Sequence, residues 1–261
     1  MVVPSMIDLH SHVLPGIDDG PDTVERSVML ARAAVAAGIR TMVATPHVSA
    51  RCRNDADTIA RLVDQVNWRL RAEEIELEIL PGAEIAITHL PNIEPYELAR
   101  LGLGGGSWLL VEPPFALIAP DLENRLLDLT RAGRNVVLAH PERCPALQRD
   151  RQIVRNLVDA GVLMSVTAGS LVGRFGGEVK RYAAELAREE LIHNVTSDAH
   201  DSLRRPPGMA EELDRAGLAQ MTDWLTCAVP GAILNGGEIP PRPESSRGGV
   251  NQRLRAWRQR L

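Results

Sequence analysis

The sequence contains few aromatic residues, few cysteines and no excess of positive charge. Aromatic residues make up 3% of its 261 residues, so a core built from its 44% hydrophobic residues must be mainly aliphatic. Cys52, Cys144 and Cys227 are an odd number without zinc-finger spacing, which argues against a disulfide framework and a cysteine zinc site. The formal net charge of -5 argues against nucleic acid as a partner.

The hydrophobic pattern of the sequence also shows no membrane-spanning stretch and no export signal. No apolar run approaches the length of a membrane span, and the N-terminal stretch lacks a basic region followed by a signal-peptide core. We therefore expect a cytoplasmic protein. A chain of this length builds one large domain or two small ones, and a single α/β domain of barrel size is the simplest fit.

Apolar strands alternate with amphipathic helices along most of the chain. The patterns predict strands over 6–10, 41–45, 77–80, 108–111, 135–139, 162–166 and 192–196, and helices over 21–37, 57–71, 121–132, 153–160 and 179–188. The stretch 89–103 contains two prolines and predicts only a short helix, followed by a flexible glycine connection. Near-continuous hydrophobic strands separated by helices predict a parallel sheet covered by helices.

The predicted strand ends carry side chains that bind metal ions. These residues are His10, His12, His47, Glu84, Glu112, His140, Asp198 and His200. The carboxyl ends of the strands of an α/β barrel meet on one rim, so separate segments deliver these imidazoles and carboxylates to one place. Alternate residues of a strand share a face, which puts His10 and His12 together with Asp8. The pattern predicts a divalent metal site on that rim.

Several short motifs, in this order, resemble those of a known family. They are Asp8-Leu9-His10-Ser11-His12, Asp18-Asp19-Gly20-Pro21, Thr45-Pro46-His47, Gly82-Ala83-Glu84, His140-Pro141-Glu142-Arg143, the stretch 168–176 and Ser197-Asp198-Ala199-His200. The set resembles the polymerase-and-histidinol-phosphatase (PHP) superfamily, specifically its bacterial manganese-dependent protein-tyrosine phosphatases of the capsular and exopolysaccharide type. The resemblance covers residues 6–234 and implies a distorted, TIM-like β/α barrel with a metal cluster at the C-terminal rim of the strands.

The resemblance also implies a cluster of two or three divalent ions, manganese first, with iron or zinc as alternatives. One ion would lie among His10, His12, Glu84 and Asp198. Glu84 would bridge to a second ion held with Glu112 and His140. His47, His200 and an acid of the Asp18–Asp19 pair, with Asp18 as the assigned ligand, would complete a third position. The family usually has an aromatic residue where this chain has Cys144.

Adjacent divalent ions lower the pKa of a bound water, so hydroxide is available to attack phosphorus in line. Arg143, Arg204 and Arg205 follow metal-ligand motifs and are our candidates for binding phosphate oxygens, and Asp19 and His200 complete the catalytic set. A cysteine phosphatase needs an arginine six residues after its cysteine. Thr58, Asp150 and Ile233 stand at that offset, so a phosphocysteine intermediate is excluded.

The remaining features have simpler interpretations. Arg174 and Phe175 follow a strand and either shape the pocket or dock a partner, whereas His89 and His193 lie off the rim pattern and are interpreted as structural or exposed. The barrel is expected to span 1–239. Residues 240–261 read as a Pro/Gly/Ser linker and a basic amphipathic segment, which packs on the domain or a subunit or contacts an anionic membrane surface.

The resemblance thus implies a metal-dependent phosphatase that acts on phosphotyrosine of a protein, with a membrane-anchored tyrosine kinase of polysaccharide synthesis as the expected substrate. Three alternatives stay open. One is a small-molecule phosphoesterase of the same fold, resembling histidinol phosphatase, and another is a non-catalytic module that binds the kinase. A metal-dependent amidohydrolase also fits the fold, because a fold does not fix a function.

Overall fold

In the computed structural model, which describes residues 5–243, every paired strand runs parallel to its neighbours. One sheet has the order β1 (Met6–Ser11), β2 (Ile39–Ala44) and β4 (Glu78–Pro81). The other has the order β3 (His47–Val48), β5 (Glu84–Ala86), β6 (Trp108–Glu112), β7 (Asn135–Ala139), β8 (Leu163–Thr167) and β9 (Asn194–Thr196). The predicted parallel α/β architecture is confirmed.

The strands form two sheets and not one closed barrel. Pro46 has no N–H to donate, and it lies between β2 and β3, while β4 ends at Pro81 and Gly82 follows it before β5. Backbone hydrogen bonds join the two sheets where the ladders stop. The amide of His12 donates to Ala199 (2.8 Å) and the amide of Asp198 donates to His10 (3.0 Å), while the amide of Thr45 extends the contact of β2 with β1 by donating to Ser11 (2.8 Å). The C-terminal end of β1 therefore lies between β2 and the segment after β9.

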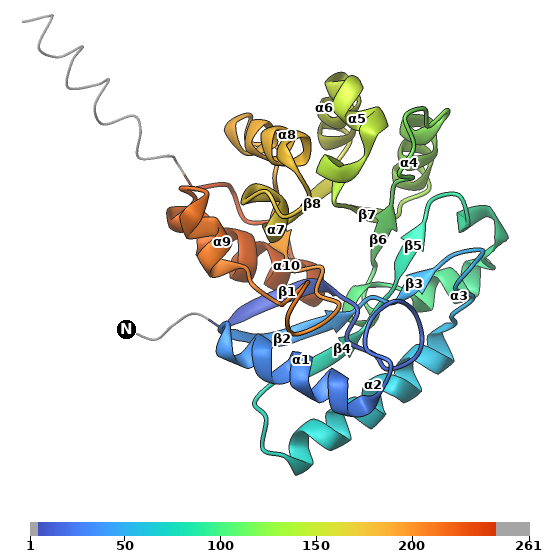
Figure 1. Ribbon diagram of the computed structural model, residues 1–261. Helices are drawn as coiled ribbons and strands as arrows, with labels where there is room; N and C mark the ends of the chain where they lie inside the picture. Colours follow the sequence, from blue (N-terminus) through green and yellow to red (C-terminus); the bar gives the residue numbers. More distant parts are fainter. Residues whose placement is uncertain (1–4, 244–261) are drawn as a thin grey trace, which may run out of the picture.

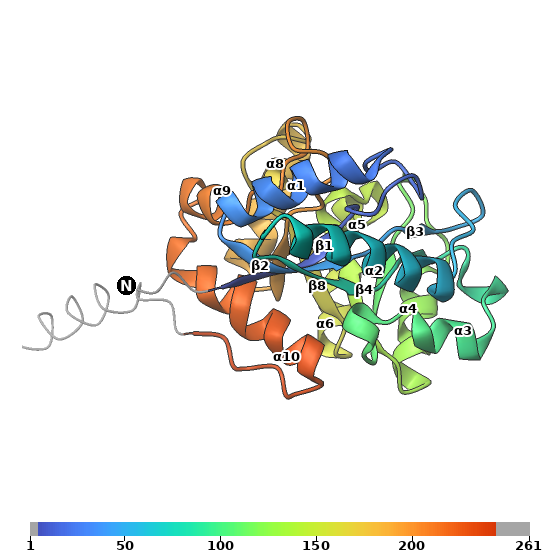
Figure 2. The same ribbon diagram turned by 90° about the horizontal axis from the view of Figure 1, so that it is seen from below.

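Five longer helices cover the sheets: α1 (Val24–Ala36), α2 (Ala56–Ala72), α4 (Leu122–Arg131), α6 (Arg151–Asp159) and α8 (Gly177–Arg188). The side chain of Thr23 caps α1 by accepting a hydrogen bond from the amide of Arg26. In Figure 1, α1 and α2 lie beside β2 and β4, while α4, α6 and α8 stand in a row along β6 to β8. Figure 2 shows α1 and α2 running side by side across the molecule.

Shorter helices fill the connections. They are α3 (Pro95–Arg100), α5 (Pro145–Arg149), α7 (Ala168–Leu171), α9 (Ala210–Arg215) and α10 (Val229–Asn235), with 3-10 turns at Leu90–Asn92, Leu103–Gly105, Pro141–Arg143 and Ala219–Met221 and a π-helical turn at Trp224–Ala228. Between residues 201 and 239 the sequence pattern assigned no element. There the π-helical turn and α10 pack against β1, and the turn also contacts β9, which buries Trp224 and Leu225.

The core is aliphatic, as the composition predicts, because Leu, Ile, Val, Met and Ala supply most of the buried residues. Residues Val136–Ala139 of β7 are fully buried, so this strand has no solvent-facing side. The three cysteines are free. Among the described residues, no helix combines the length and the apolar character needed to cross a membrane.

The boundary region after residue 239 also contacts this domain. The carbonyl of Pro240 accepts from Trp224 Nε1 (3.1 Å), and Arg242 donates to the carbonyl of Ile192 (2.8 Å) while lying over the ring of Trp224. The predicted basic amphipathic segment lies outside the described residues.

Candidate metal centre

Six segments bring imidazoles and carboxylates to the C-terminal rim of the strands. His10 lies in β1 and His12 follows it, His47 begins β3, Glu84 begins β5 and Glu112 ends β6. His140 follows β7, and Asp198 and His200 follow β9. His10, His12, Glu84, His140 and Asp198 are at most 2% exposed. His140 and Asp198 also adopt positive φ angles of 31° and 50°, a conformation that is uncommon for non-glycine residues.

The first group lies between β1 and the segment after β9. The Nε2 atoms of His10 and His12 face each other at 3.3 Å. Asp198 Oδ1 lies 3.6 Å from the first and 3.5 Å from the second, and Glu84 Oε2 lies 3.3 and 3.4 Å from them. These four residues are the set that the resemblance places around one ion.

The first group of possible ligands itself consists of His10, His12 and Asp198, and Glu84 belongs to the next two groups. Its Oε1 lies 2.7 Å from His140 Nε2, and these two residues form a group with His10. Its Oε2 lies 3.0 Å from His47 Nδ1, and these two form a group with Glu112, whose Oε2 is 3.9 Å from the same nitrogen. The second predicted set is therefore divided, because Glu112 lies beside His47 and His140 lies beside His10.

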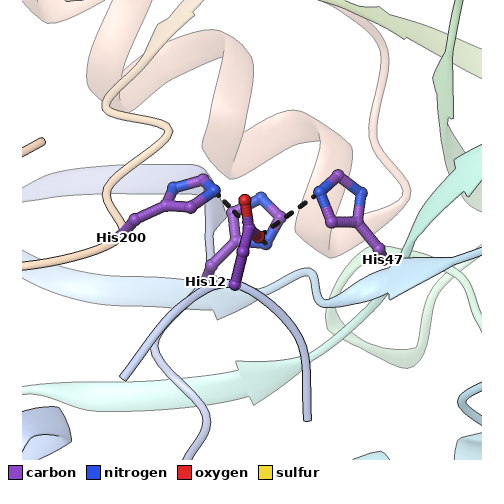
Figure 3. A group of neighbouring side chains, drawn as sticks. His12, His47 and His200 are labelled. Carbon is purple, nitrogen blue, oxygen red and sulfur yellow. Dashed lines mark ion pairs between the residues drawn. The ribbon is translucent and has the colours of Figure 1, made fainter. Parts of the chain in front are cut away.

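The fourth group consists of His12, Asp19, His47 and His200. Asp19 Oδ1 lies 3.2 Å from His200 Nε2 and 3.5 Å from His47 Nε2. Figure 3 shows the three imidazoles together, and the ring of His12 lies 3.9 Å from that of His200 and 4.6 Å from that of His47. This group gathers at the third predicted position, with Asp19 as its acid.

Asp18, the acid assigned as a ligand at that position, faces elsewhere and lies in none of the four groups of described residues. Its Oδ2 accepts from His12 Nδ1 (2.7 Å) and from the amide of His47 (3.2 Å). Its contacts fix the orientation of the His12 ring. In the same way, the Nδ1 atom of His200 contacts the carbonyl of Asp198 at 3.0 Å. Metal-binding histidines characteristically have such a partner on the second ring nitrogen.

The charges of these groups depend on one another. Burial by itself raises the pKa of Glu84, but the charges and hydrogen bonds of His10, His12 and His140 hold it well below its usual value. Burial, together with the nearby Glu84 carboxylate, raises the pKa of Glu112 to about 7. The carboxylates of this rim therefore need positive charge beside them to stay ionised together.

The donor set fits divalent cations. Two imidazole nitrogens at 3.3 Å form a hydrogen bond only if one of them carries a proton, and when neither does, both lone pairs point at the same space, where a cation can bind them. Atoms that bind one ion at about 2.1 Å lie about 3.0–3.4 Å from one another. The nitrogen and oxygen atoms of the first group have nearly this spacing. Mixed imidazole and carboxylate ligands suit manganese, iron and zinc.

Two arginines contact the back of this cluster. Arg143 and Arg205 each donate to Asp198 Oδ2 at 2.6 Å, while Asp198 Oδ1 faces His10 and His12. Arg204 lines a pocket of about 550 Å³ with Asp19, His200, Met29 and Leu203 among its walls. Of the three predicted phosphate-binding arginines, the structure brings Arg143 and Arg205 to Asp198 and leaves Arg204 on the adjoining pocket wall.

Several residues near the centre carry no signal strong enough to be predicted from the sequence. Asp8 accepts from the amide of Ser197 (3.0 Å) and from its hydroxyl, and so ties β1 to the segment that holds Asp198. Glu142 accepts from Ser170 Oγ (2.7 Å) and from the amide of Thr167 (3.0 Å). Both acids belong to the quoted motifs, and only their partners, distant in sequence, reveal these supporting contacts.

Two of the other predicted residues lie away from the metal ligands. Arg174 pairs with Glu212 (3.2 Å). His193 accepts from the amide of Met164 (3.1 Å), in line with its structural interpretation. Phe175, by contrast, lies 4.5 Å from the guanidinium of Arg143 and 5.9 Å from that of Arg205. It packs beside both arginines that contact Asp198.

A family model described as capsular polysaccharide synthesis, CpsB/CapC, matches residues 6–233. The chain belongs to this family. The CpsB/CapC relatives include the tyrosine-protein phosphatase YwqE of Bacillus subtilis, which is 38% identical over 75% of this chain and 78% of that protein. A putative tyrosine-protein phosphatase CapC of Staphylococcus aureus is 30% identical over 77% of this chain and 79% of its own length. The resemblance drawn from the motifs is confirmed.

Solved structures agree with this membership. One match has a TM-score of 0.80 and 33% identity. It comes from crystal structures of YwqE from Bacillus subtilis and CpsB from Streptococcus pneumoniae, which are described as unique metal-dependent tyrosine phosphatases. The match covers 92% of this chain and 100% of that one. A β-aspartyl dipeptidase of Fervidobacterium islandicum matches with a TM-score of 0.55 and 12% identity, a likeness that concerns the fold alone.

Proposed function

We propose that this protein hydrolyses the phosphate ester of phosphotyrosine in a protein, with two or three divalent ions held on the rim of its strands. The observation that carries the proposal is the convergence of four overlapping ligand groups beside two arginines that share one oxygen of Asp198. Membership of the CpsB/CapC family, whose relatives are named tyrosine-protein phosphatases, supports the substrate.

The ligand groups suggest how the ions are held. Glu84 belongs to two groups, and His10, His12 and His47 each belong to two, so the ions would be neighbours with common ligands. We assign Asp19, rather than Asp18, to the group with His47 and His200. Manganese is the proposed metal, with iron or zinc as alternatives. When bound, such ions supply activation of water and neutralise charge on the phosphoryl group.

The chain itself places the phosphoryl group. The guanidinium groups of Arg143 and Arg205 lie on the same carboxylate oxygen, so their remaining N–H donors can bind phosphate oxygens from one side. Asp198 holds both arginines with one oxygen and faces His10 and His12 with the other. Of the two proposed catalytic residues that pair with each other, Asp19 is 59% exposed in its side chain and faces solvent, whereas His200 is buried.

Phenolate is a stable leaving group, because the parent phenol has a pKa of about 10. Hydrolysis of phosphotyrosine therefore needs less help from a general acid than hydrolysis of an alkyl phosphate. For the natural substrate we propose a membrane-anchored tyrosine kinase of polysaccharide synthesis, and for the location the cytoplasm. The three free cysteines agree with a reducing compartment.

Metal-stripped protein re-supplied with manganese, iron, zinc or magnesium tests the proposal. We expect at least one of the first three metals to restore phosphate release from a phosphotyrosine peptide, and His140→Ala to abolish it. Histidinol phosphate serves as the competing substrate. Turnover of histidinol phosphate with none of the peptide would replace this proposal by a small-molecule phosphoesterase. Binding of the peptide without turnover under any metal would favour the regulatory module.

A further inference from the structure

An exposed aromatic side chain lies at the edge of the metal centre, on the loop after β6. Phe115 follows Glu112 by three residues and is 55% exposed. Its ring stacks on the imidazole of His140, with centroids 5.4 Å apart and an interplanar angle of 19°. The guanidinium of Arg143 lies 5.0 Å from the centre of the same ring. Phe115 thus contacts one proposed metal ligand and one proposed phosphate-binding residue, and still presents much of its surface to solvent.

Arg143 lies between two aromatic rings with different surroundings. Phe175 is only half-buried but contacts both arginines, at 4.5 and 5.9 Å, and so it holds the guanidinium groups in place. Of the two arginines, Phe115 contacts only Arg143, and its ring is more exposed than that of Phe175. An aromatic group that arrives from solvent therefore meets Phe115.

The chemistry of a phosphate monoester determines which part of the substrate lies beside Phe115. A phosphoryl group bound by Arg143 and Arg205 carries its organic part on one remaining oxygen, so that part lies next to the arginines. In phosphotyrosine this part is a flat phenyl ring, which gains from offset or edge-to-face contact with another ring. In an alkyl phosphate such as phosphoserine it is a short chain that gains little from the same surface.

We propose that Phe115 is a specificity-determining residue whose exposed surface packs against the phenyl ring of the substrate, and so favours aryl over alkyl phosphates. This inference rests on the proposed function, because it concerns the organic group of the same ester. It names a contact that lies outside the ligand set and the arginine pair.

Two non-hydrolysable probes isolate this contact. Benzylphosphonate and ethylphosphonate share the phosphonate group and the adjoining methylene, and they differ by the ring. Calorimetric titration of the manganese-loaded protein measures both affinities. We expect Phe115→Leu to weaken benzylphosphonate about fivefold, which corresponds to roughly 1 kcal/mol. The affinity for ethylphosphonate should change less than twofold, and Phe115→Tyr should restore the wild-type ratio.

Leu117→Ala provides the matched control. Leu117 lies on the same loop and is 66% exposed, so its loss should change neither affinity. Phe175→Leu should weaken both probes, because Phe175 contacts the arginines that bind the phosphonate.

Each remaining outcome opposes the proposal. An equal loss of both probes in Phe115→Leu would mean that the ring acts only through Arg143 or His140. No loss of benzylphosphonate, or equal affinities of the two probes in the wild type, would also overturn it. The proposed function is judged separately by phosphate release from a phosphotyrosine peptide. Turnover with an unchanged affinity ratio would refute only the role of Phe115, and binding without turnover would refute only the proposed function.

Discussion

Replacing Arg143 and Arg205 by alanine, singly and together, tests whether the two arginines act on the phosphoryl group as a pair. Both donate to Asp198 Oδ2 at 2.6 Å, so removal of either one leaves this buried oxygen with a charged donor. The single variants should therefore fold and retain their metal. We expect each single variant to lose contacts to the phosphate in the bound state and in the transition state. The buried carboxylate of Asp198 keeps one arginine as its partner in both variants.

The magnitude follows from the loss of charged hydrogen bonds to the phosphoryl oxygens. One such donor contributes about 3 kcal/mol to the transition state, so each alanine variant should lose about a hundredfold in kcat/KM. The double variant should lose more than the product of the two, because it alone leaves the buried Asp198 Oδ2 without a charged donor. Arg143→Lys should recover little, since an ammonium group cannot form the two parallel bonds of a guanidinium.

The assay is kcat/KM for a phosphotyrosine peptide in the manganese-loaded protein, with metal content measured in each variant. Arg204→Ala and Arg174→Ala are the matched controls, because Arg204 lines the adjoining pocket and Arg174 pairs with Glu212. Each should stay within about threefold of the wild type, well below the loss expected for a phosphoryl contact. A larger loss in Arg204→Ala than in Arg205→Ala would refute this assignment of the two neighbouring residues.

Three further predictions concern metal affinity and stability. Asp18→Asn removes the negative charge beside His12 Nδ1 and should weaken metal binding about 10–100-fold in calorimetric titration. Chelation should lower the melting temperature by about 5–10 °C, because bound ions stabilise only the folded state. Burial, together with Arg242, lowers the pKa of His193 from 6.5 to about 4, so its contribution to stability is complete above pH 6.5 and is lost as pH falls toward 4. In His193→Asn this acid-induced loss in urea unfolding should be smaller by about 2 kcal/mol.

Each of these has a clear contrary result. Unchanged metal affinity in Asp18→Asn would show that the His12 ring needs no charged partner. An equal melting temperature with and without chelator would mean that the ions contribute nothing to the folded state. If His193→Asn lost as much stability between pH 7 and pH 4 as the wild type, His193 would not be the group that takes up the proton on unfolding.

The strand pattern could be predicted because it is local. The strand Asn135–Ala139 has the predicted bounds, since an apolar run between a glycine turn and a histidine leaves little choice. The rim residues followed from the same pattern, because a polar residue after a buried parallel strand has only one side of the sheet to reach. Their convergence required no knowledge of contacts between distant segments.

The roles of individual residues in the site depend on three-dimensional geometry, which adjacent residues in the sequence do not reveal. Asp18 and Asp19 stand side by side in one turn, and the backbone of that turn turns one carboxylate to His12 Nδ1 and the other to the imidazoles of His47 and His200. Arg204 and Arg205 divide in the same way after His200. In each pair the two residues are of the same type, and only their position in the backbone turn decides which contact each side chain makes.

Other features could not be predicted because they depend on tertiary contacts. The strands β3 and β5 contain two and three residues, too few to show a period, and they form because prolines interrupt the preceding ladders. The π-helical turn at Trp224–Ala228 gains its order from packing on β1 and β9. Phe115 follows two prolines in a loop, and only its distance to His140 and Arg143 distinguishes it from an ordinary exposed residue.

The most direct test of the proposed metal centre is anomalous diffraction at the manganese edge from crystals grown with manganese and orthophosphate. We expect two or three neighbouring peaks, each within bonding distance of a ligand group, with Glu84 contacting more than one. We also expect phosphate oxygens in contact with Arg143 and Arg205. A single isolated ion, or phosphate bound away from both arginines, would contradict the claim that the strand ends build a multi-metal phosphatase centre.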